Sequence, residues 1–413
     1  MSAQYLPALL RLLTLCILLG AEAASAAPDI LLPRTGISAD ELALLINDND
    51  PISRETGAYY QRTRRIPEQN VIHLRLPLGK TALSSQEFEP LKAEIDRLTP
   101  PHIQAYAVAW TQPFQVGCMS MTSALAFGHD EKYCSTKCAP TSASRYFDSA
   151  SAYPHDDFQI RPAMMLAGRN FADVKALIDR GVAADHAFPE GTAYLLNTSD
   201  TARSVRASQF AIAQTRLSAL LPMEIIEADA IADRQDVLFY FTGLVQVPHL
   251  ATLKFLPGAL ADHLTSLGGR LTDSPQMSSL RWLEAGATAS YGTVTEPCNH
   301  QQKFPIPAVA MFHYLAGATA IEAYWKSVAW PGEGLFIGEP LARPFAPTLT
   351  RIDETNYQLT LMSPKKAVWR LEQADSIMGP FLPTRRGIPV TAGKNTVRIN
   401  ITGINKRYLR LVR

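Results

Sequence analysis

Residues 286–305 read Gly-Ala-Thr-Ala-Ser-Tyr-Gly-Thr-Val-Thr-Glu-Pro-Cys-Asn-His-Gln-Gln-Lys-Phe-Pro. A short apolar strand, predicted over 287–294, runs directly into a polar segment that holds Glu296, Cys298 and His300. In an open α/β sheet, ligands bind in the crevice beyond the carboxyl ends of the strands. We therefore expect the functional site of this protein at the end of this strand.

Segments of strand type and helix type alternate on both sides of this stretch. The predicted strands are 41–47, 71–76, 103–111, 192–198, 223–226, 236–242, 252–256, 287–294 and 334–337. The predicted helices are 51–64, 85–98, 172–181, 200–217, 277–284 and 307–329. This alternation predicts an α/β domain over residues 27–345, with a mostly parallel sheet of about six strands and helices on both faces.

Two regions depart from the alternation. Residues 112–161 are rich in Ser, Thr, Ala and Cys and have no clear period, which indicates a long insertion. Residues 349–413 show short alternating runs separated by turn residues, which predicts a small β-sandwich-like module after a linker at 343–347. The sequence shows no evident internal repeat.

The N-terminus has the three parts of a secretory signal peptide over residues 1–26. Arg11 precedes a short apolar run, Leu12–Leu19, and Ala24-Ser25-Ala26 is a cleavage site of small residues. A membrane anchor is the alternative, but a spanning helix needs about 20 apolar residues. We expect an exported protein, periplasmic or secreted, with no stable membrane span after cleavage.

The net charge and the number of cysteines limit which classes of partner and which cellular compartment are expected. Formal net charge is +1, from 39 basic and 38 acidic residues, so nothing favours a nucleic-acid partner. Four cysteines follow the signal peptide: Cys118, Cys134, Cys138 and Cys298. An even count in an exported chain favours disulfides over a zinc site. We expect at least one disulfide within Cys118–Cys138, with Cys298 either pairing with the third of these cysteines or free.

The polar segment after residue 294 allows thiol chemistry. Cys298 could act as a nucleophile with His263 or His300 as its base, and Glu296 could orient the imidazole. The alternative is that Cys298 is buried or disulfide-bonded. Asp262 and His263 should follow the strand 252–256 at the same edge of the sheet, where Asp262 could instead cap a helix.

A metal site is a further alternative at this edge. Carboxylate and imidazole groups suit several divalent ions, and four side chains are available: Asp262, His263, Glu296 and His300. Asp48, Asn49 and Asp50 could bind calcium, but a turn and a helix cap explain them more simply. We expect no cofactor and no resident metal.

Four segments resemble the caspase-like α/β fold, in particular secreted gingipain-type cysteine peptidases. They are 57–72, 236–243, 285–292 and 334–341, the last with Gly338-Glu339-Pro340. The resemblance covers about residues 40–345 and implies a three-layer, caspase-like domain. The peptidases carry a His-Gly pair after the strand matching 236–242, where this chain has Gly243-Leu244. Their nucleophilic cysteine follows the next strand, where this chain has none.

Longer runs are similar to an uncharacterised family of exported bacterial proteins from species with exosortase-type sorting systems. The matching runs are 117–123, 192–200, 257–265 and 291–305. This resemblance implies an envelope protein linked to protein sorting or exopolysaccharide, with an envelope protein or polysaccharide as partner. The leading hypothesis is therefore a non-catalytic binding or accessory protein. The alternatives are a cysteine hydrolase using Cys298 with His263 or His300, and a metal-dependent hydrolase.

Overall fold

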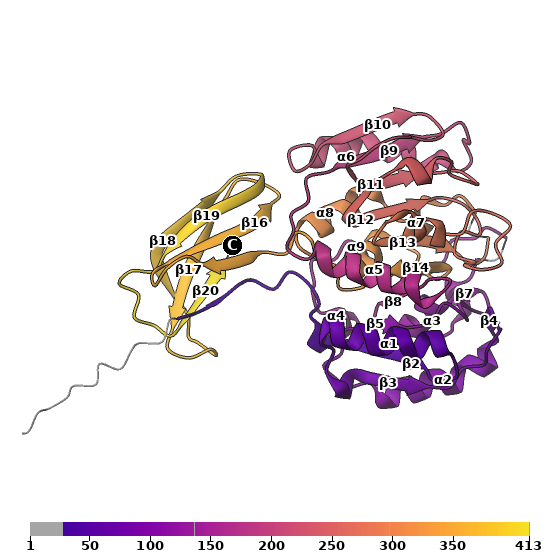
Figure 1. Cartoon of the computed structure of the whole chain (residues 1–413), viewed down its shortest axis with the longest axis horizontal. Coiled ribbons are helices and arrows are strands. Elements are labelled where there is room, and N and C mark those ends of the chain that lie inside the picture. Colours follow the sequence, from indigo (N-terminus) through magenta and orange to yellow (C-terminus); the bar gives the residue numbers. More distant parts are fainter. Residues whose placement is uncertain (1–27, 136, 297, 413) are drawn as a thin grey trace, which may run out of the picture.

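The computed structural model describes residues 28–135, 137–296 and 298–412, so the predicted signal peptide lies outside the described residues. An α/β domain with a ten-stranded sheet stands beside a smaller all-β module (Figure 1). The domain strands are β2 (Leu42–Asn47), β3 (Val71–Leu74), β5 (Ala105–Val108), β8 (Ala163–Met165), β9 (Thr192–Asn197), β10 (Met223–Glu227), β11 (Val237–Thr242), β12 (Phe255–His263), β13 (Ala289–Thr293) and β14 (Gly334–Gly338).

The large sheet has the order β10-β9-β11-β12-β13-β14-β8-β5-β2-β3. Every neighbouring pair in it is parallel except β13 and β14, which run antiparallel. The mostly parallel sheet is therefore confirmed, but it is larger than predicted and changes direction once. We call β14-β8-β5-β2-β3 the first half-sheet and β13-β12-β11-β9-β10 the second. Their carboxyl ends lie at opposite edges.

The two half-sheets share one strand order. In each, the second strand along the chain (β3 or β10) lies outside the first (β2 or β9), and the later strands add on the other side. β14, from the end of the domain, fills the last place in the first half-sheet. Each half-sheet thus has the doubly wound 2-1-3-4-5 order, whose binding crevice lies between its first and third strands. The sequence prediction missed this repeat.

A local feature repeats as well, at the end of each first strand. β2 ends at Asn47, whose backbone N–H donates to Ser53 Oγ at 2.8 Å. β9 ends at Asn197, and the next N–H, of Thr198, donates to Ser204 Oγ at 2.9 Å. In both half-sheets a serine of the following turn or helix therefore satisfies the backbone where the strand stops.

Helices cover both faces of the sheet (Figure 1). They are α1 (Pro51–Arg64), α2 (Ser85–Leu98), α3 (Met121–Phe127), α4 (Pro154–Phe158), α5 (Phe171–Ala184), α6 (Phe210–Leu217), α7 (Leu280–Ala285), α8 (Pro307–Leu315) and α9 (Ala320–Ser327). Asp50 caps α1 by accepting from Ile52 N–H, and Pro51 opens it, so these residues form the predicted cap. Gly57 lets α1 lie against Ile46 of β2, where a Cβ would collide.

Several predicted elements are corrected. The strand expected at 252–256 is β12, Phe255–His263, so Asp262 and His263 belong to the strand rather than to a loop after it. The helix expected at 307–329 is divided into α8 and α9, because Gly317 takes a φ of 95° between them. The helix expected at 200–217 begins as a 3-10 helix, Ser204–Gln209, before α6.

The predicted insertion at 112–161 is partly core. It holds β6 (Gln115–Val116), β7 (Met119–Ser120), α3, a 3-10 turn (Glu131–Tyr133) and α4, and β6 and β7 form a small sheet with β4 (Ala82–Leu83). All but the last residue of α3 are buried. The hydroxyl of Ser120 donates to Gly334 O at 2.6 Å, tying this segment to the start of β14.

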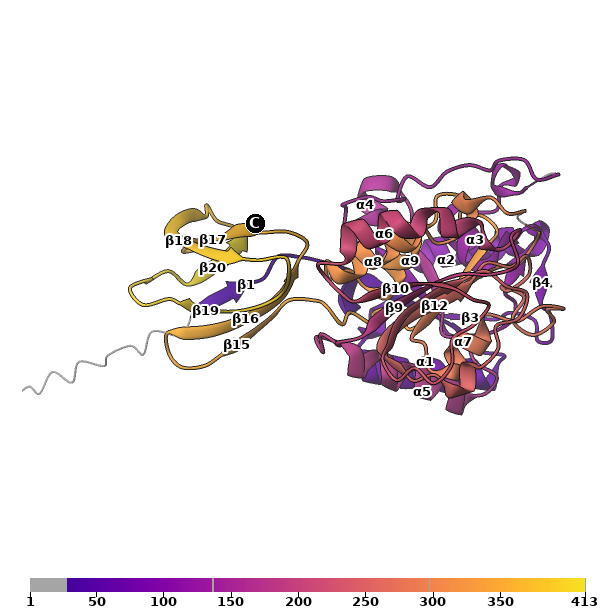
Figure 2. The same ribbon diagram turned by 90° about the horizontal axis from the view of Figure 1, so that it is seen from above.

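The C-terminal module is a sandwich of two small sheets, as predicted from the alternating runs. Its strands are β1 (Asp29–Leu31), β15 (Thr348–Arg351), β16 (Asn356–Ser363), β17 (Ala367–Ala374), β18 (Leu382–Val390), β19 (Gly393–Asn400) and β20 (Tyr408–Val412). The sheets are β1-β20-β17-β18 and β15-β16-β19. β1 pairs with β20, which corrects its assignment to the α/β domain. Two segments, after β1 and before β15, join the module to the domain (Figures 1 and 2).

Within the described ranges, no helix combines the length and apolar character that a membrane crossing requires.

Candidate functional site

A recess of about 300 Å³ lies at the carboxyl edge of the second half-sheet. The loops that follow β9, β12 and β13 meet there, because these strands run parallel and end at one edge. We call this recess the disulfide crevice. Its lining residues are Cys138, Ala202, Arg203, Leu264, Ser266, Glu296, Cys298, Asn299 and Phe304. The structure thus places a recess where the sequence predicts the site, after β12 and β13.

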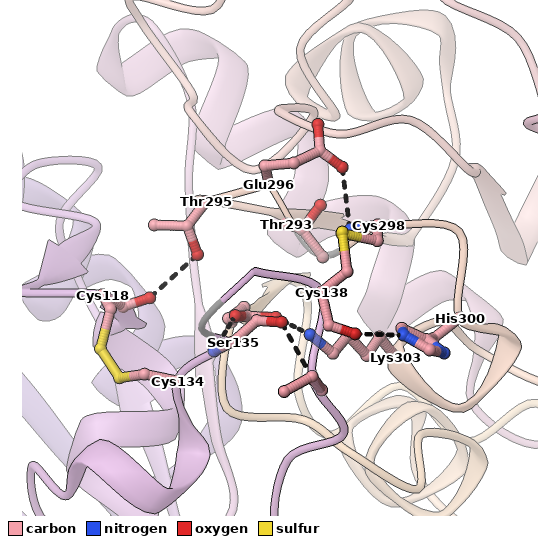
Figure 3. Close-up of polar contacts among 12 residues, drawn as sticks. Cys118, Cys134, Ser135, Cys138, Thr293, Thr295, Glu296, Cys298, His300 and Lys303 are labelled. Atoms are coloured by element: carbon pink, nitrogen blue, oxygen red, sulfur yellow. Dashed lines mark hydrogen bonds and ion pairs between the residues drawn. A yellow bond between two sulfur atoms is a disulfide. The ribbon is translucent and has the colours of Figure 1, made fainter.

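Cys298 is joined to Cys138 in a disulfide that forms part of the crevice wall (Figure 3). Cys118 pairs with Cys134, so the predicted disulfide within Cys118–Cys138 is confirmed. Two disulfides are consistent with folding in an oxidising compartment. A thiolate nucleophile requires a free sulfur. In this structure the sulfur of Cys298 is already bonded.

Glu296 and His300 flank the disulfide but serve the local backbone (Figure 3). Glu296 Oε1 accepts from the Cys298 N–H at 2.8 Å and fixes the turn after β13. His300 Nε2 donates to the Cys138 carbonyl at 2.7 Å, and its ring lies 5.6 Å from that of Trp330. Both side chains therefore hold the disulfide-linked segments in place.

His263 lies inside the protein rather than at the crevice. Its side chain is 1% exposed, and Trp282 Nε1 donates to its Nδ1 at 2.9 Å. Nδ1 is therefore the acceptor, which leaves Nε2 to donate to the Met277 carbonyl at 3.1 Å. Burial lowers the pKa of this imidazole to about 3, so the ring is neutral at ordinary pH.

Asp262 is also buried, on the neighbouring position of β12. Its Oδ1 accepts from Arg206 Nη1 at 2.6 Å, and the other Arg206 nitrogen donates to the Thr242 carbonyl at 2.5 Å. Burial raises the pKa of Asp262 to about 6, against the opposing effect of Arg206. The pair ties the 3-10 helix after β9 to β11 and β12 beneath the crevice.

Two charged residues near the crevice were missed by the sequence analysis. Arg203 lines it, with Nη1 donating to Asp200 at 2.8 Å and Nε to Thr265 Oγ1 at 3.1 Å. Arg206 lies one turn further along the chain and is 3% exposed. The available signal was the segment 199–206 after a predicted strand, which repeats the polar turn after β2.

A buried ion pair supports the loop after β13 from below. Lys303 Nζ donates to Glu333 at 2.8 Å, and both side chains are at most 3% exposed. Glu333 also accepts from the Ser135 N–H at 2.7 Å, which anchors the segment before Cys138. The crevice wall is therefore held by a disulfide, a buried ion pair and a charge-assisted hydrogen bond.

The arrangement separates the groups that catalysis would need together. Cys298 is disulfide-bonded, His263 is enclosed, and His300 is engaged by a backbone carbonyl. Across residues 28–135, 137–296 and 298–412, no three His, Cys, Asp or Glu side chains gather into a set that could hold a metal ion. The crevice instead offers Arg203, Ser266, Glu296 and Asn299 around the apolar Leu264 and Phe304.

Comparison of this chain with known protein families, curated proteins and solved structures found no match.

Proposed function

We propose that this chain is an exported, non-catalytic binding protein of the cell envelope, and that the disulfide crevice is its binding site. The observation that carries the proposal is the Cys138–Cys298 disulfide. The hydrolase alternative needs the sulfur of Cys298 as a free thiolate, but this sulfur is bonded to Cys138 and lines the disulfide crevice. Both ring nitrogens of His263 are hydrogen-bonded inside the protein, and Nε2 of His300 donates to the Cys138 carbonyl.

The lining of the crevice supports recognition of a small, polar part of a larger partner. Its volume of about 300 Å³ is at the lower end of ligand pockets. Arg203 and Glu296 bring opposite charges to one recess, and Leu264 and Phe304 supply an apolar surface. An envelope protein or polysaccharide is the proposed partner, and the link to sorting or exopolysaccharide comes from the family resemblance.

The proposal also treats the α/β domain as a caspase-like domain without its peptidase dyad. The mostly parallel sheet between helices supports this relationship in part. Leu244 follows Gly243 after β11, and β12 runs on through Asp262 and His263 without a cysteine. The antiparallel junction of β13 and β14 gives the domain a wider sheet than we expected.

Absence of catalysis is tested with a fluorogenic peptide library and protein purified without reductant. We expect no hydrolysis above background for the wild type. The matched variants are Cys138→Ser/Cys298→Ser and Cys118→Ser/Cys134→Ser, each of which removes one disulfide. Hydrolysis that disappears in the first variant and persists in the second, with both variants folded at the assay temperature, would overturn the proposal.

Binding at the crevice is tested by retention of the protein on envelope polysaccharides and on immobilised envelope proteins. We expect Arg203→Ala to weaken retention about tenfold, because a charge-assisted hydrogen bond is lost. Arg234→Ala is the control, since Arg234 is an exposed arginine of the same half-sheet outside the crevice. Equal loss in both variants would count against the crevice as the binding site.

A further inference from the structure

The carboxyl edge of the first half-sheet carries a second recess, of about 350 Å³. The loops after β2, β3, β5 and β8 all contribute to it, as expected at the switch point between β2 and β5. Its lining residues are Asp50, Ile52, Leu78, Gly79, Thr111, Gln112, Gly168, Arg169 and Thr272. This recess therefore lies at the carboxyl edge of its half-sheet, as the disulfide crevice does in the second half-sheet.

A larger recess, of about 510 Å³, adjoins it and shares Arg169 and Thr272 with it. Its walls are the loops that follow β11 and β12. Its further lining residues include Val247, Leu250, Met277 and Arg281. We call the two recesses together the Arg169 groove. A groove of this extent fits a segment of a chain molecule better than a compact ligand.

Two arginines along the groove, Arg169 and Arg281, are positioned by one carboxylate and could bind an anion. Arg169 Nε donates to Glu284 Oε1 at 2.6 Å, and Arg281 pairs with the other oxygen of the same carboxylate. Their side chains remain 61% and 52% exposed. Each guanidinium has five N–H donors, so most of them remain for a ligand. Asp50 is the single acidic residue lining the described groove, and its carboxylate already caps α1.

Aliphatic side chains line the groove together with these polar groups. Ile52 and Leu78, which are 37% and 60% exposed, flank the smaller recess. Val247, Leu250 and Met277 line the larger one. No Phe, Tyr or Trp occurs among the lining residues that the structure describes, although sugar rings commonly stack on such side chains. The lining therefore favours a polypeptide over a polysaccharide.

We propose that the Arg169 groove binds an extended acidic peptide segment in which carboxylate and aliphatic side chains alternate. The carboxylates pair with Arg169 and Arg281, and the aliphatic side chains cover Ile52 and Leu78. The smaller recess lies at the opposite edge of the sheet from the disulfide crevice, whereas the larger recess shares the loop after β12 with that crevice. The lining residues of the groove and of the crevice are different, and the proposal does not rest on the function proposed for the crevice.

The test is fluorescence anisotropy with the whole exported protein and three probes. The first is a labelled twelve-residue peptide of alternating Glu or Asp and Leu or Val. The second is the same peptide with Lys at every acidic position, and the third is labelled polygalacturonate. We expect the acidic peptide alone to bind, and its affinity to fall as salt rises. Arg169→Ala and Arg281→Ala should each weaken binding about tenfold.

Two controls separate the groove from general charge. Arg398 lies in the C-terminal module and is 62% exposed, close to the value for Arg169, so Arg398→Ala should leave affinity unchanged. Arg234→Ala, which changes an exposed arginine outside both the groove and the crevice, should also leave it unchanged. Unaltered melting temperatures will show that the variants fold. Binding of the lysine peptide or of polygalacturonate in place of the acidic peptide, no peptide binding, or equal losses in the control variants would each overturn the proposal.

Discussion

The two half-sheets share a strand order but differ in how each fifth strand is secured. In the first, the chain after β14 reaches Glu339, which is fully buried and accepts from Arg64 Nε at 2.9 Å and from Tyr60 at 2.7 Å. In the second, the chain after β13 reaches Cys298, which is joined to Cys138 across 160 residues. The topology is repeated, whereas the chemistry at each edge is set by the loops.

This difference has a functional consequence. The disulfide closes one side of the crevice in the second half-sheet and removes its cysteine from thiol chemistry. The Arg169 groove, which includes the carboxyl edge of the first half-sheet, has no such crosslink within the described residues and presents two exposed arginines. We therefore propose binding, rather than thiol chemistry, at both edges.

The largest expected effect is loss of the Cys138–Cys298 disulfide. Closing a long loop restricts the unfolded chain more than closing a short one, so Cys138→Ser/Cys298→Ser should cost about 5 kcal/mol. Cys118→Ser/Cys134→Ser, with a separation of 16 residues, should cost about 3 kcal/mol. Urea unfolding without reductant measures both. The opposite ranking would mean that the long crosslink is not what secures the second half-sheet.

Breaking the buried ion pair of the first half-sheet should have the next largest effect. Arg64→Met leaves the Glu339 carboxylate buried without its cation, which should cost about 4 kcal/mol. The control is Lys92→Met, which breaks the pair with Asp96 on the surface of α2 and should cost about 0.5 kcal/mol. Similar losses in the two variants, measured by urea unfolding, would contradict the role given to Glu339.

The two half-sheets also differ in the residue that follows their third strand, β5 or β11. It is Ala109 after β5 but Gly243 after β11, where the Arg203 carbonyl lies against the position of a Cβ. Gly243→Ala should therefore cost about 2 kcal/mol through overpacking. Gly268→Ala is the control, because the nearest atom to its Cβ would be the Thr265 methyl at 3.3 Å rather than a backbone carbonyl in collision with it. Thermal unfolding that shows equal costs would remove the close approach as the reason for Gly243.

The smallest predicted effect is a pH dependence in the second half-sheet. The folded pKa of His263, about 3, lies below its unfolded value, so His263 stabilises the protein above about pH 6.5 and loses this contribution as pH falls toward 3. Asp262 acts oppositely, because its folded pKa of about 6 is raised, so its contribution is present at low pH and is lost as pH rises through 6. In the wild type, the two residues therefore change the free energy of unfolding with pH in opposite directions.

The His263→Gln variant lacks the pH-dependent contribution of His263 to the free energy of unfolding. Between pH 6 and pH 5, the stability of the wild type should fall by about 1 kcal/mol relative to that of the variant. Urea unfolding at a series of pH values measures this difference. Parallel pH profiles for the two proteins would show that His263 does not titrate with folding.

The sequence predicted the elements whose signals are local. The Asp50 cap with Pro51 and the buried run of β11 needed only short-range patterns. The strand β12 was cut short at residue 256, because Pro257 and Gly258 are turn residues in isolation but lie within a strand here. The reversal at β13 and β14 could not be predicted, since strand direction follows from which segments pair over long distances.

The location of the candidate site was predicted from the sequence, but the roles of its side chains were not. Residues 296–300 do form its wall, and the segment after β12 does reach it. Burial of His263 and Asp262 depends on packing by Trp282 and Arg206, which are distant in sequence. The shared pattern of residues 45–50 and 195–200, Leu-Ile-Asn-Asp-Asn-Asp and Leu-Leu-Asn-Thr-Ser-Asp, could have revealed the repeat and with it the second edge.

Disulfide mapping tests the central claim most directly. Protein recovered from an oxidising compartment is alkylated without reduction, digested and examined by mass spectrometry. The account predicts two linked peptide pairs, Cys118 with Cys134 and Cys138 with Cys298, and no alkylated Cys298. An alkylated Cys298 in folded protein would contradict it, because the second half-sheet would then present a free thiol at its crevice.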